Sequence, residues 1–334
     1  MKAVVLVGGA GTRLRPLTFS TPKPLLPIAN VAFLERQLKW LAEYGVDEAV
    51  LSLGYLPEAF TDHFSDERFG DMKLRFVVEH EPLGTAGGIR FAADGINERI
   101  IVCNGDVLTD LDLAAFVAFH EARGAEATIS LARVDDPSAF GVVPTREDGE
   151  VIAFVEKPPR DQAPTHWINA GTYVLEPSVL ASIPPRLNVS IERETFPRML
   201  ERPGQLYAMR SAGYWLDIGT PTKYFEAHLD VLAGKVGLPP APGAREQSAG
   251  VWLEPGAQVD GTATLTAPVL IGARARVGAD ATIRRSVVGA DAVVGPGATV
   301  ADCVLFDGVV IGADDSVRAV AIGTESRLSL DGGQ

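Results

Sequence analysis

A short apolar strand followed at once by a glycine-rich loop constrains the fold of this chain most strongly. Residues 3–7 (Ala-Val-Val-Leu-Val) form a run of the kind found in buried parallel strands. Three glycines, Gly8, Gly9 and Gly11, follow within four residues, and glycine lets the backbone approach a bulky ligand closely. Free backbone N–H groups beside arginine side chains suit phosphate, so the sequence predicts a phosphate-binding loop.

The loop differs from two familiar glycine-rich phosphate loops. A P-loop ends in Gly-Lys-Ser or Gly-Lys-Thr, whereas this loop continues Gly-Thr-Arg. The dinucleotide-binding fingerprint has a third glycine that opens a helix, where this chain has Leu14. We therefore expect an extended loop that runs over its ligand to about Pro27, with Lys23 held on stiff backbone between two prolines.

The composition excludes several classes of protein. The formal net charge of −13 argues against nonspecific nucleic-acid binding, which needs a basic face. The longest apolar runs are far too short to span a bilayer and no signal peptide is visible, so we expect a cytoplasmic protein. Cys103 and Cys303 lie too far apart to indicate a disulfide framework or a zinc site. In this acidic chain Arg13, Arg15 and Lys23 make the first loop locally basic, as a phosphate site requires.

Strand and helix patterns alternate through the first 135 or so residues. The strand patterns occupy 3–7, 48–53, 74–78, 100–103 and 127–131, and the helical patterns 33–44 and 111–121. This alternation predicts an α/β fold with a Rossmann-like, mostly parallel sheet and helices on both faces. Ligands bind beyond the carboxyl ends of such strands, where the glycine loop and Asn104-Gly105-Asp106 both belong. Shorter strands over 140–218, with a hairpin at 146–149, are expected to supply the second wall of a cleft.

The C-terminal third has a different pattern. An aliphatic residue followed by a small one recurs about every six residues, as in Ile271-Gly272, Val277-Gly278 and Val288-Gly289. This period predicts a small left-handed parallel β-helix of hexapeptide repeats, with three hexads in each coil and exposed apolar ends that favour association with another subunit. The predicted domains are a catalytic domain over 1–235, a Pro-rich linker over 236–248 and the β-helix over 249–325.

The motifs together resemble one enzyme family. The first loop, with Pro22-Lys23-Pro24, is similar to the signature of the sugar-1-phosphate nucleotidyltransferases, or nucleotide-sugar pyrophosphorylases. The segments Ser190-Ile191-Glu192-Arg193-Glu194 and Phe196-Pro197, together with the repeats, are most similar to the mannose-1-phosphate guanylyltransferase branch. Further matching motifs are Glu81-Pro82-Leu83-Gly84-Thr85-Ala86-Gly87, Asn104-Gly105-Asp106, Phe154-Val155-Glu156-Lys157-Pro158, Ile168-Asn169-Ala170-Gly171 and Trp215-Leu216-Asp217-Ile218-Gly219-Thr220.

The resemblance implies that a nucleoside triphosphate and a sugar 1-phosphate react and release pyrophosphate. The attacking phosphate oxygen is already ionised near pH 7, because the second phosphate pKa is about 6, so no general base is required. Catalysis then consists of positioning and charge neutralisation. Arg13 and Lys23 are the candidates for holding the triphosphate and the charge at the α-phosphate. Asp106 and Asp217 are the candidate ligands of Mg²⁺, which prefers one or two carboxylates with phosphate oxygens and water.

The resemblance also implies two substrate subsites. Glu79 aligns with a position that contacts the base, and its carboxylate can accept hydrogen bonds from guanine N1–H and N2–H. Lys157 can pair with the sugar's phosphate, and Trp215 either stacks on the sugar or fills the core. The expected nucleotide-binding residues are Leu6, Gly8, Gly9, Gly11, Thr12, Glu79, Pro82, Gly84 and Thr85, and the expected sugar-phosphate-binding residues are Gly141, Glu156, Lys157, Asn169, Gly171 and Trp215.

Alternatives stay open beside the leading hypothesis, which is synthesis of GDP-mannose from GTP and mannose 1-phosphate. A glucose-1-phosphate thymidylyl-, uridylyl- or adenylyltransferase would differ by only a few hydrogen bonds. A non-catalytic regulatory subunit is a third hypothesis, against which the chain retains its candidate catalytic residues. An acyltransferase site in the repeats is disfavoured, because none of the five histidines lies there. We expect the two substrates as partners, no nucleic-acid or membrane partner, and a homo-oligomer formed through the C-terminal repeats.

Overall fold

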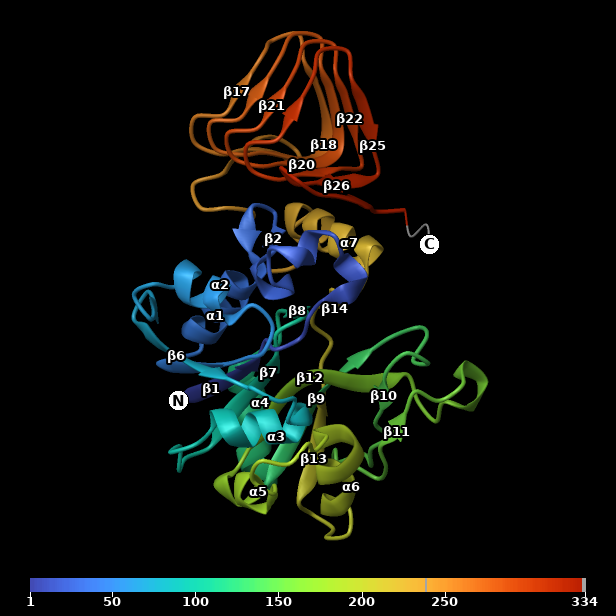
Figure 1. Ribbon diagram of the computed structural model, residues 1–334. Coiled ribbons are helices and arrows are strands. Elements are labelled where there is room, and N and C mark those ends of the chain that lie inside the picture. The colour runs from blue at the N-terminus through green and yellow to red at the C-terminus, as the bar shows by residue number, and fades with distance from the viewer. Residues whose placement is uncertain (238, 332–334) are drawn as a thin grey trace. The chain divides into compact units, whose positions relative to one another are not determined.

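The computed structural model (Figure 1) describes residues 1–237 and 239–331, which fall into two compact units. Unit 1 combines Met1–Gly9 with Gln37–Trp215, and unit 2 combines Ala10–Arg36 with the chain from Leu216 onward. The chain therefore leaves unit 1 in the middle of the glycine-rich loop and returns to it before the end of the first long helix. The domain boundaries expected from the sequence stay a prediction.

Unit 1 is built on a Rossmann-like parallel core. Strand β1 (Lys2–Leu6) pairs in parallel with β4 (Glu48–Leu53) on one side and with β7 (Ile100–Asn104) on the other. Strand β6 (Met72–Val78) continues the parallel order beyond β4. The residues of β1 and β4 that face the core are fully buried, as their apolar sequences predict.

Antiparallel strands extend this core into a mixed sheet of ten strands. Strand β12 (Trp167–Leu175) runs antiparallel to β7 and to β9 (Ala127–Arg133), and β13 (Leu206–Arg210) is parallel to β9. Strands β10 (Gly141–Val142) and β11 (Val155–Glu156) form the antiparallel edge beside β12. The short strands expected over 140–218 therefore join the same sheet. The remaining strands are β5 (Arg68–Phe69), β8 (Val107–Thr109) and β14 (Trp215–Asp217).

Local sequence signals begin and end the helices. Asp112 caps α4 (Leu113–Arg123) by accepting a hydrogen bond from the Ala115 amide at 2.9 Å, and Gly124 ends it with a φ of 57°. The other α-helices are α1 (Phe33–Glu43), α2 (Pro57–His63), α3 (Gly84–Ala92), α5 (Pro177–Ser182), α6 (Phe196–Met199) and α7 (Pro221–Leu232), and the short turns are η1 (Thr12–Leu14), η2 (Leu17–Phe19), η3 (Lys23–Leu25), η4 (Arg160–Gln162) and the π-type η5 (Ile191–Thr195).

The basic loop of unit 2 is not extended, and this corrects the expectation from its sequence. Three 3₁₀ turns, η1 to η3, follow one another before Pro27. They are closed by hydrogen bonds from the amides of Leu14, Phe19 and Leu26, at 3.0 to 3.1 Å, to carbonyls three residues earlier. Proline fixes a φ that suits a 3₁₀ turn as well as an extended chain, so the prolines did not distinguish the two.

A hairpin links this loop to the rest of unit 2. Strands β2 (Pro27–Ile28) and β3 (Val31–Ala32) pair around a turn in which Ala29 and Asn30 both have positive φ. On helix α7, Tyr224 donates its hydroxyl to the Pro27 carbonyl at 2.8 Å, and His228 Nδ1 accepts from the Ala29 amide at 3.0 Å. The hairpin therefore has fixed contacts with α7, and Figure 1 shows β2 beside that helix.

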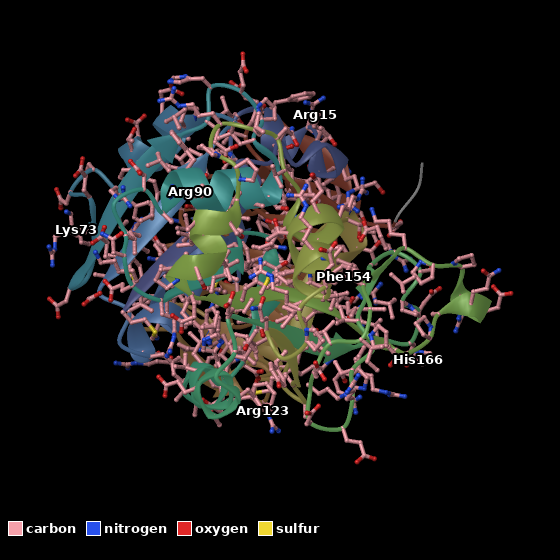
Figure 2. The ribbon with its side chains drawn as sticks, turned by 90° about the horizontal axis from the view of Figure 1, so that it is seen from below. Arg15, Lys73, Arg90, Arg123, Phe154 and His166 are labelled. Carbon is pink, nitrogen blue, oxygen red and sulfur yellow. The ribbon has the colours of Figure 1, made fainter. Side chains whose placement is uncertain are left out.

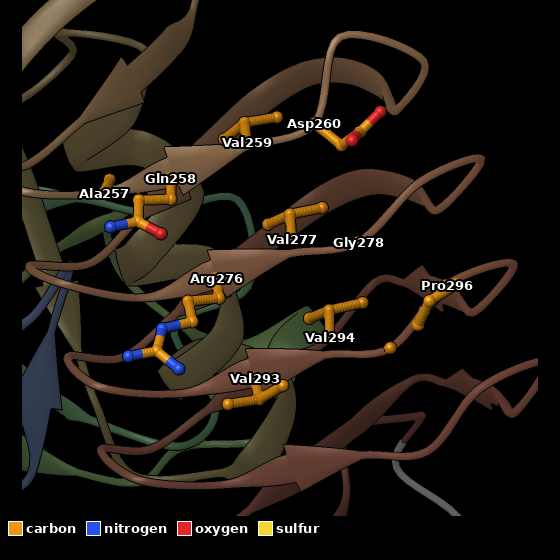
Figure 3. Close-up of a pocket in the computed structure, with 11 residues that line it drawn as sticks. Ala257, Gln258, Val259, Asp260, Arg276, Val277, Gly278, Val293, Val294 and Pro296 are labelled. Carbon is orange, nitrogen blue, oxygen red and sulfur yellow. The ribbon is translucent and has the colours of Figure 1, made fainter.

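The C-terminal repeat region (residues 245–331) is a stack of short parallel strands. Along one face, Gln258 pairs with Arg276, Arg276 with Val293 and Val293 with Val310, so the partners are 18, 17 and 17 residues apart. Three six-residue repeats give this spacing. Figure 3 shows Val259, Val277 and Val294 one above another on successive strands.

The interior of the repeat region is aliphatic, as the six-residue pattern predicts. Its strands are β15 (Arg245–Ser248), β16 (Val251–Leu253), β17 (Gln258–Val259), β18 (Thr264–Ile271), β19 (Arg276–Val277), β20 (Thr282–Val288), β21 (Val293–Val294), β22 (Thr299–Ala301), β23 (Val304–Leu305), β24 (Val310–Ile311), β25 (Ser316–Arg318), β26 (Val320–Ile322) and β27 (Arg327–Ser329).

Candidate active site

A cavity of about 520 Å³ opens in unit 1 where the glycine-rich loop begins. Its walls come from the carboxyl ends of β1, β4 and β6 and from the start of α3. Seven of the residues expected to bind nucleotide line it, together with four that the sequence did not single out. The lining residues are Leu6, Gly8, Gly9, Ser52, Gly54, Tyr55, Glu79, His80, Pro82, Gly84 and Thr85.

Two glycines let the ends of β1 and β4 approach each other beside the cavity. The Val7 amide donates to the Ser52 carbonyl at 3.0 Å, which continues the pairing of the two strands. A Cβ atom on Gly54 would lie only 2.8 Å from the Gly8 carbonyl oxygen, so a side chain there would push the loop away. The signal for Gly54 was available, because it is a glycine directly after a strand that ends at the same edge.

The Glu79 side chain is held in place by the protein. Ser52 donates its hydroxyl to Glu79 Oε1 at 2.7 Å, and the Leu83 amide donates to Oε2 at 3.2 Å. A carboxylate has about four acceptor positions, so these bonds fix its orientation and leave capacity for a ligand. Glu79 therefore both lines the cavity and orders the loop that leads into α3.

The first amides of α3 do not point at an empty site. The amides of Ala86 and Gly87 both donate to the Val189 carbonyl, at 2.9 and 3.3 Å. Gly84 has a φ of +69°, and a Cβ atom there would lie 2.6 Å from the same carbonyl. These amides are therefore not the phosphate cradle that a helix N-terminus often forms. Val189 was not identified from the sequence, because its contact depends on chain packing.

In unit 2, the basic loop closes on itself around Gly11. A Cβ atom on Gly11, whose φ is +57°, would lie 3.0 Å from Lys23 Cβ and 3.1 Å from Thr18 Cγ2. Thr18 donates its hydroxyl to the Gly11 carbonyl at 2.9 Å. Gly11 therefore brings the backbone of Lys23 close to the start of the loop. Thr12 and Arg13 are exposed on it.

Arg13 lies beside Asp217 and Gly219 in unit 2. A Cβ atom built on Gly219 would be 2.6 Å from Arg13 Nη2 and 3.0 Å from Asp217 Oδ1. One predicted catalytic residue and one predicted metal ligand therefore meet around a glycine whose small size makes room for both. Arg15 has another contact, because its guanidinium lies over the Phe19 ring at 5.1 Å (Figure 2).

Asp106, the other predicted metal ligand, lies in unit 1 directly after β7. The preceding Gly105 donates its amide to the Leu6 carbonyl at 2.9 Å, and a Cβ atom there would lie 2.4 Å from Val7 Cγ1. Asp106 is thus held next to the end of β1, where the glycine-rich loop starts. Burial raises the pKa of the Tyr173 hydroxyl well above its ordinary value, and the negative charges of Glu192 and Asp106 raise that pKa further.

The acidic side chains suit a hard cation that shares its ligands with a substrate. Within residues 1–237 and 239–331, no three side chains of His, Cys, Asp or Glu form a group that could hold a metal ion by themselves. Mg²⁺ does not need such a group, because it retains water and binds phosphate oxygens beside one or two carboxylates. Asp106 and Asp217 therefore fit Mg²⁺ better than a metal that requires a full protein cage.

The residues expected to bind the sugar phosphate lie along β10, β11 and β12. Gly141 pairs with Glu156, and a Cβ atom on Gly141 would be 2.7 Å from the Phe154 ring and 3.2 Å from Glu156 Oε2. Lys157 has a φ of 48°, and its Nζ lies 3.9 Å from Glu156 Oε1. The Phe154 ring, labelled in Figure 2, lies 6.1 Å from the Phe196 ring and so packs beneath this edge.

Asn169 and Gly171 shape an irregularity in β12. The register of β12 against β9 shifts between Asn169 and Tyr173. Asn169 Oδ1 accepts from the Gly171 amide at 3.0 Å, and its Nδ2 donates to the Tyr173 hydroxyl at 2.8 Å. Gly171, with a φ of +76°, leaves room for the Asn104 side chain, which a Cβ atom would meet at 2.7 Å. Asn169 thus uses its amide to hold the strand.

Trp215 packs inside unit 1. Its indole N–H donates to the Ala170 carbonyl at 2.9 Å, and its ring meets the Phe140 ring edge-on with centroids 5.4 Å apart. Trp215 also packs on the small apolar cluster around Val142 and Ile168. These contacts match the core role that the sequence left open, and stacking on a sugar stays a prediction.

A second hollow, of about 600 Å³, lies on the β17–β19–β21 face of the C-terminal repeat region (Figure 3). Its charged lining side chains are Asp260 and Arg276, and its other residues are mostly aliphatic or glycine. The hollow therefore lacks a histidine base of the kind an acyltransferase would need. Among the helices that the structure describes, none is long and apolar enough to cross a membrane.

Comparison with known proteins gives the family of this chain. Residues 2–234 match the nucleotidyl transferase family. The mannose-1-phosphate guanylyltransferase of Mycobacterium tuberculosis is 41% identical over 278 residues, which cover 83% of this chain and 76% of that protein. Mannose-1-phosphate guanylyltransferase 1 of Arabidopsis thaliana is 43% identical over 281 residues, which cover 81% and 75%.

Solved structures agree with this match. The crystal structure of HddC from Yersinia pseudotuberculosis superposes with a TM-score of 0.59 and 32% identity, covering 68% of this chain and 97% of that one, and HddC has also been solved in complex with GMP-PN. A putative glucose-1-phosphate thymidylyltransferase from Bacillus anthracis gives a TM-score of 0.61 at 26% identity, covering 68% and 94%. The chain therefore belongs to the nucleotidyl transferase family of enzymes, which transfer a nucleotidyl group to a sugar 1-phosphate.

Proposed function

We propose that this enzyme transfers a guanylyl group from GTP to mannose 1-phosphate, forming GDP-mannose and releasing pyrophosphate. The observation that carries the proposal is the cavity of about 520 Å³ at the start of the glycine-rich loop, lined by a fixed acidic side chain, Glu79. The guanylyltransferase relatives, at 41 and 43% identity, support the choice of base and sugar.

Glu79 is the proposed contact to the base. Its carboxylate is oriented by Ser52 and the Leu83 amide, so a guanine in the cavity would meet a fixed acceptor for its N1–H and N2–H groups. Adenine offers no such pair of donors on its Watson–Crick edge, and a site built for hydrogen bonds discriminates strongly against a ligand that lacks them. Gly8, Gly9, Gly84 and the remaining cavity residues would contact the nucleotide through their backbones.

Arg13 and Lys23 are the proposed contacts to the triphosphate. Four residues along the chain separate Arg13 from Gly9, which lines the cavity, so their Cα atoms are at most about 14 Å apart. An arginine side chain spans much of such a distance. Its fixed positive charge can stabilise the charge that develops at the α-phosphate, and Lys23 supplies a second cation beside Gly11.

Asp106 and Asp217 are the proposed ligands of Mg²⁺. When bound, the metal ion would neutralise phosphate charge and orient the phosphate oxygens. Both aspartates are carboxylates held next to tight glycine turns, at Gly105 and Gly219. The chain itself would then supply positioning and charge, and no protein group would need to remove a proton, because the attacking phosphate oxygen is already ionised.

The sugar 1-phosphate is proposed to bind along β10, β11 and the bend of β12. Glu156 would accept hydrogen bonds from sugar hydroxyls, and Lys157 would pair with the phosphate. Gly141 and Gly171 would let the backbone come close to the sugar. Asn169 would act chiefly by holding the bend, because its side-chain amide is bonded to Tyr173 and to the Gly171 amide.

The C-terminal repeat region is proposed to be a left-handed parallel β-helix that joins subunits into a homo-oligomer. The parallel pairing at steps of 17 and 18 residues and the aliphatic interior support a β-helix. The domain limits 1–235, 236–248 and 249–325 and a cytoplasmic location stay predictions. Sedimentation velocity of the full chain and of a variant truncated after residue 235 tests the association.

Pyrophosphate release by the purified protein tests the substrate pair. The assay crosses GTP, dTTP, UTP and ATP with mannose 1-phosphate and glucose 1-phosphate in the presence of Mg²⁺. We expect GTP with mannose 1-phosphate to give the highest kcat/KM. Preference for another pair would leave the reaction class intact and replace the guanylyltransferase by one of the thymidylyl-, uridylyl- or adenylyltransferases. A folded protein that is silent throughout would favour the regulatory-subunit hypothesis.

A further inference from the structure

The segment from Asn188 to Arg193 in unit 1 packs along the loop that leads into α3, and no role has been given to it above. The Val189 amide donates to the Leu83 carbonyl at 2.9 Å, and Asn188 Nδ2 donates to the Pro82 carbonyl at 2.9 Å. With the two amides that donate back to Val189, these bonds tie the segment to the wall of the nucleotide cavity. The segment includes the first residues of η5, a π-type turn of a kind often found at functional sites.

Glu192 makes the side-chain part of this connection. Thr85, which lines the cavity, donates its hydroxyl to Glu192 Oε2 at 2.8 Å and accepts from the Ile191 amide at 2.8 Å. Ser190 donates its hydroxyl to the same Oε2 at 2.9 Å. One carboxylate oxygen thus fixes the hydroxyls of Thr85 and Ser190, and hydrogen bonds to a charged acceptor are stronger than those between neutral groups.

The other side of the same segment faces the sugar-phosphate residues. The Tyr173 hydroxyl of β12 lies close to Glu192, and it accepts a hydrogen bond from Asn169 at 2.8 Å. The next residue of the segment, Arg193, reaches Glu156 Oε1 at 3.4 Å. Glu192 and Arg193 therefore lie between the wall of the nucleotide cavity and the strands expected to bind the sugar 1-phosphate.

We propose that Glu192 is a positioning residue, which holds Thr85 against the nucleotide cavity and fixes that wall relative to the bend of β12. It acts through Thr85 and Tyr173 and does not touch the reacting atoms. The inference rests on the proposed function of the cavity as a nucleotide site, but it does not depend on which base or sugar the enzyme prefers. Loss of Glu192 would free the Thr85 hydroxyl and weaken nucleotide binding before it affects the sugar.

Kinetics and calorimetry of matched variants test this role. Glu192→Ala and Thr85→Val each remove the bond, and we expect each to raise the KM and the Kd of the nucleotide about tenfold, the effect of losing a hydrogen bond to a charged group. The KM of the sugar 1-phosphate should change less than that of the nucleotide. Glu192→Gln keeps an acceptor for Thr85 in a side chain of the same size, so it should recover most of the loss.

The control is Glu194→Gln on the same turn. Glu194 accepts from the Ser190 amide at 3.1 Å and lies 3.5 Å from Arg198, with no bond to the cavity wall. We expect its nucleotide KM to stay within about twofold of wild type, because exposed ion pairs contribute little. In the double variant Glu192→Ala/Thr85→Val the losses should not multiply, since both remove one interaction.

The outcomes separate this inference from the proposed function. Calorimetry measures nucleotide affinity directly, with whichever of the four triphosphates binds wild type, so a different preferred substrate pair refutes the guanylyltransferase assignment alone. Should Glu192→Ala not fold, Thr85→Val tests the same bond from the cavity wall. A nucleotide Kd in Thr85→Val equal to that of Glu194→Gln, or losses that multiply in the double variant, would overturn the role of Glu192.

Discussion

Replacing Gly219 by alanine tests the site in unit 2 most directly. The added Cβ atom would lie 2.6 Å from Arg13 Nη2 and 3.0 Å from Asp217 Oδ1. Non-bonded carbon contacts are comfortable at about 3.5 Å or more, so the guanidinium must retreat by about 1 Å. A displacement of about 1 Å at a catalytic group can lower the rate about 100-fold. We therefore expect Gly219→Ala to lower kcat by one to two orders of magnitude, on the order of 10- to 100-fold.

The same change should not destabilise the protein. The guanidinium is the far end of a flexible, exposed side chain and can move at little cost. Alanine also restricts the unfolded chain more than glycine does, which raises the free energy of unfolding by about 0.4 to 1 kcal/mol where the backbone allows it. A loss of activity without a loss of stability would thus separate displacement of Arg13 from damage to the fold.

The assay is steady-state pyrophosphate release, with thermal unfolding measured on the same samples. Gly261→Ala in the C-terminal repeat region is the matched control, because a Cβ atom there meets nothing within 4 Å. The double variant Arg13→Ala/Gly219→Ala should be no slower than Arg13→Ala alone. Full activity in Gly219→Ala, or rate losses that multiply in the double variant, would refute the reasoning.

Four further results are expected. Arg13→Ala should lower kcat about 10³-fold with little change in unfolding free energy, and unchanged turnover would exclude its role. Asp217→Asn should raise the Mg²⁺ concentration needed for half-maximal velocity, and the same Mg²⁺ titration as wild type would count against a metal ligand. Glu79→Gln should narrow the preference for GTP over ATP about tenfold in competition assays, whereas an unaltered preference would remove Glu79 as the base contact. Burial lowers the pKa of His228 from 6.5 to about 3, so its contribution to stability is complete above pH 6.5 and is lost as the pH falls toward 3. Urea unfolding of wild type should therefore lose about 2 kcal/mol at pH 5 relative to His228→Gln, and parallel pH profiles of the two proteins would contradict this.

Much of the fold could be predicted from short windows of sequence. The buried runs at 3–7, 48–53, 74–78 and 100–103 are strands within a residue or two, because β-branched apolar residues bounded by turn residues have few other stable conformations in a core. Asp112 caps its helix as expected. The six-residue period in the C-terminal third matches strand pairing at 17 and 18 residues.

The basic loop shows where local information ends. Its prolines are compatible with both an extended chain and 3₁₀ turns, and hydrogen bonds within the loop select the turns. The topology of the sheet shows the same limit. Strand β12 inserts between β7 and β9 in antiparallel orientation, so the run at 127–131 is not the next strand of the parallel core.

The candidate sites divide in the same way. The sequence by itself determined the residue types: glycines after the first strand, cations in the first loop, and carboxylates after apolar runs. Only the tertiary structure brought Ser52 to Glu79, Glu192 to Thr85 and Gly219 to Arg13. Periodicity and turn chemistry act between near neighbours in the chain and can be recognised from it. Contacts between distant segments depend on which strands pair and how side chains pack, and that is decided by the free energy of the whole fold.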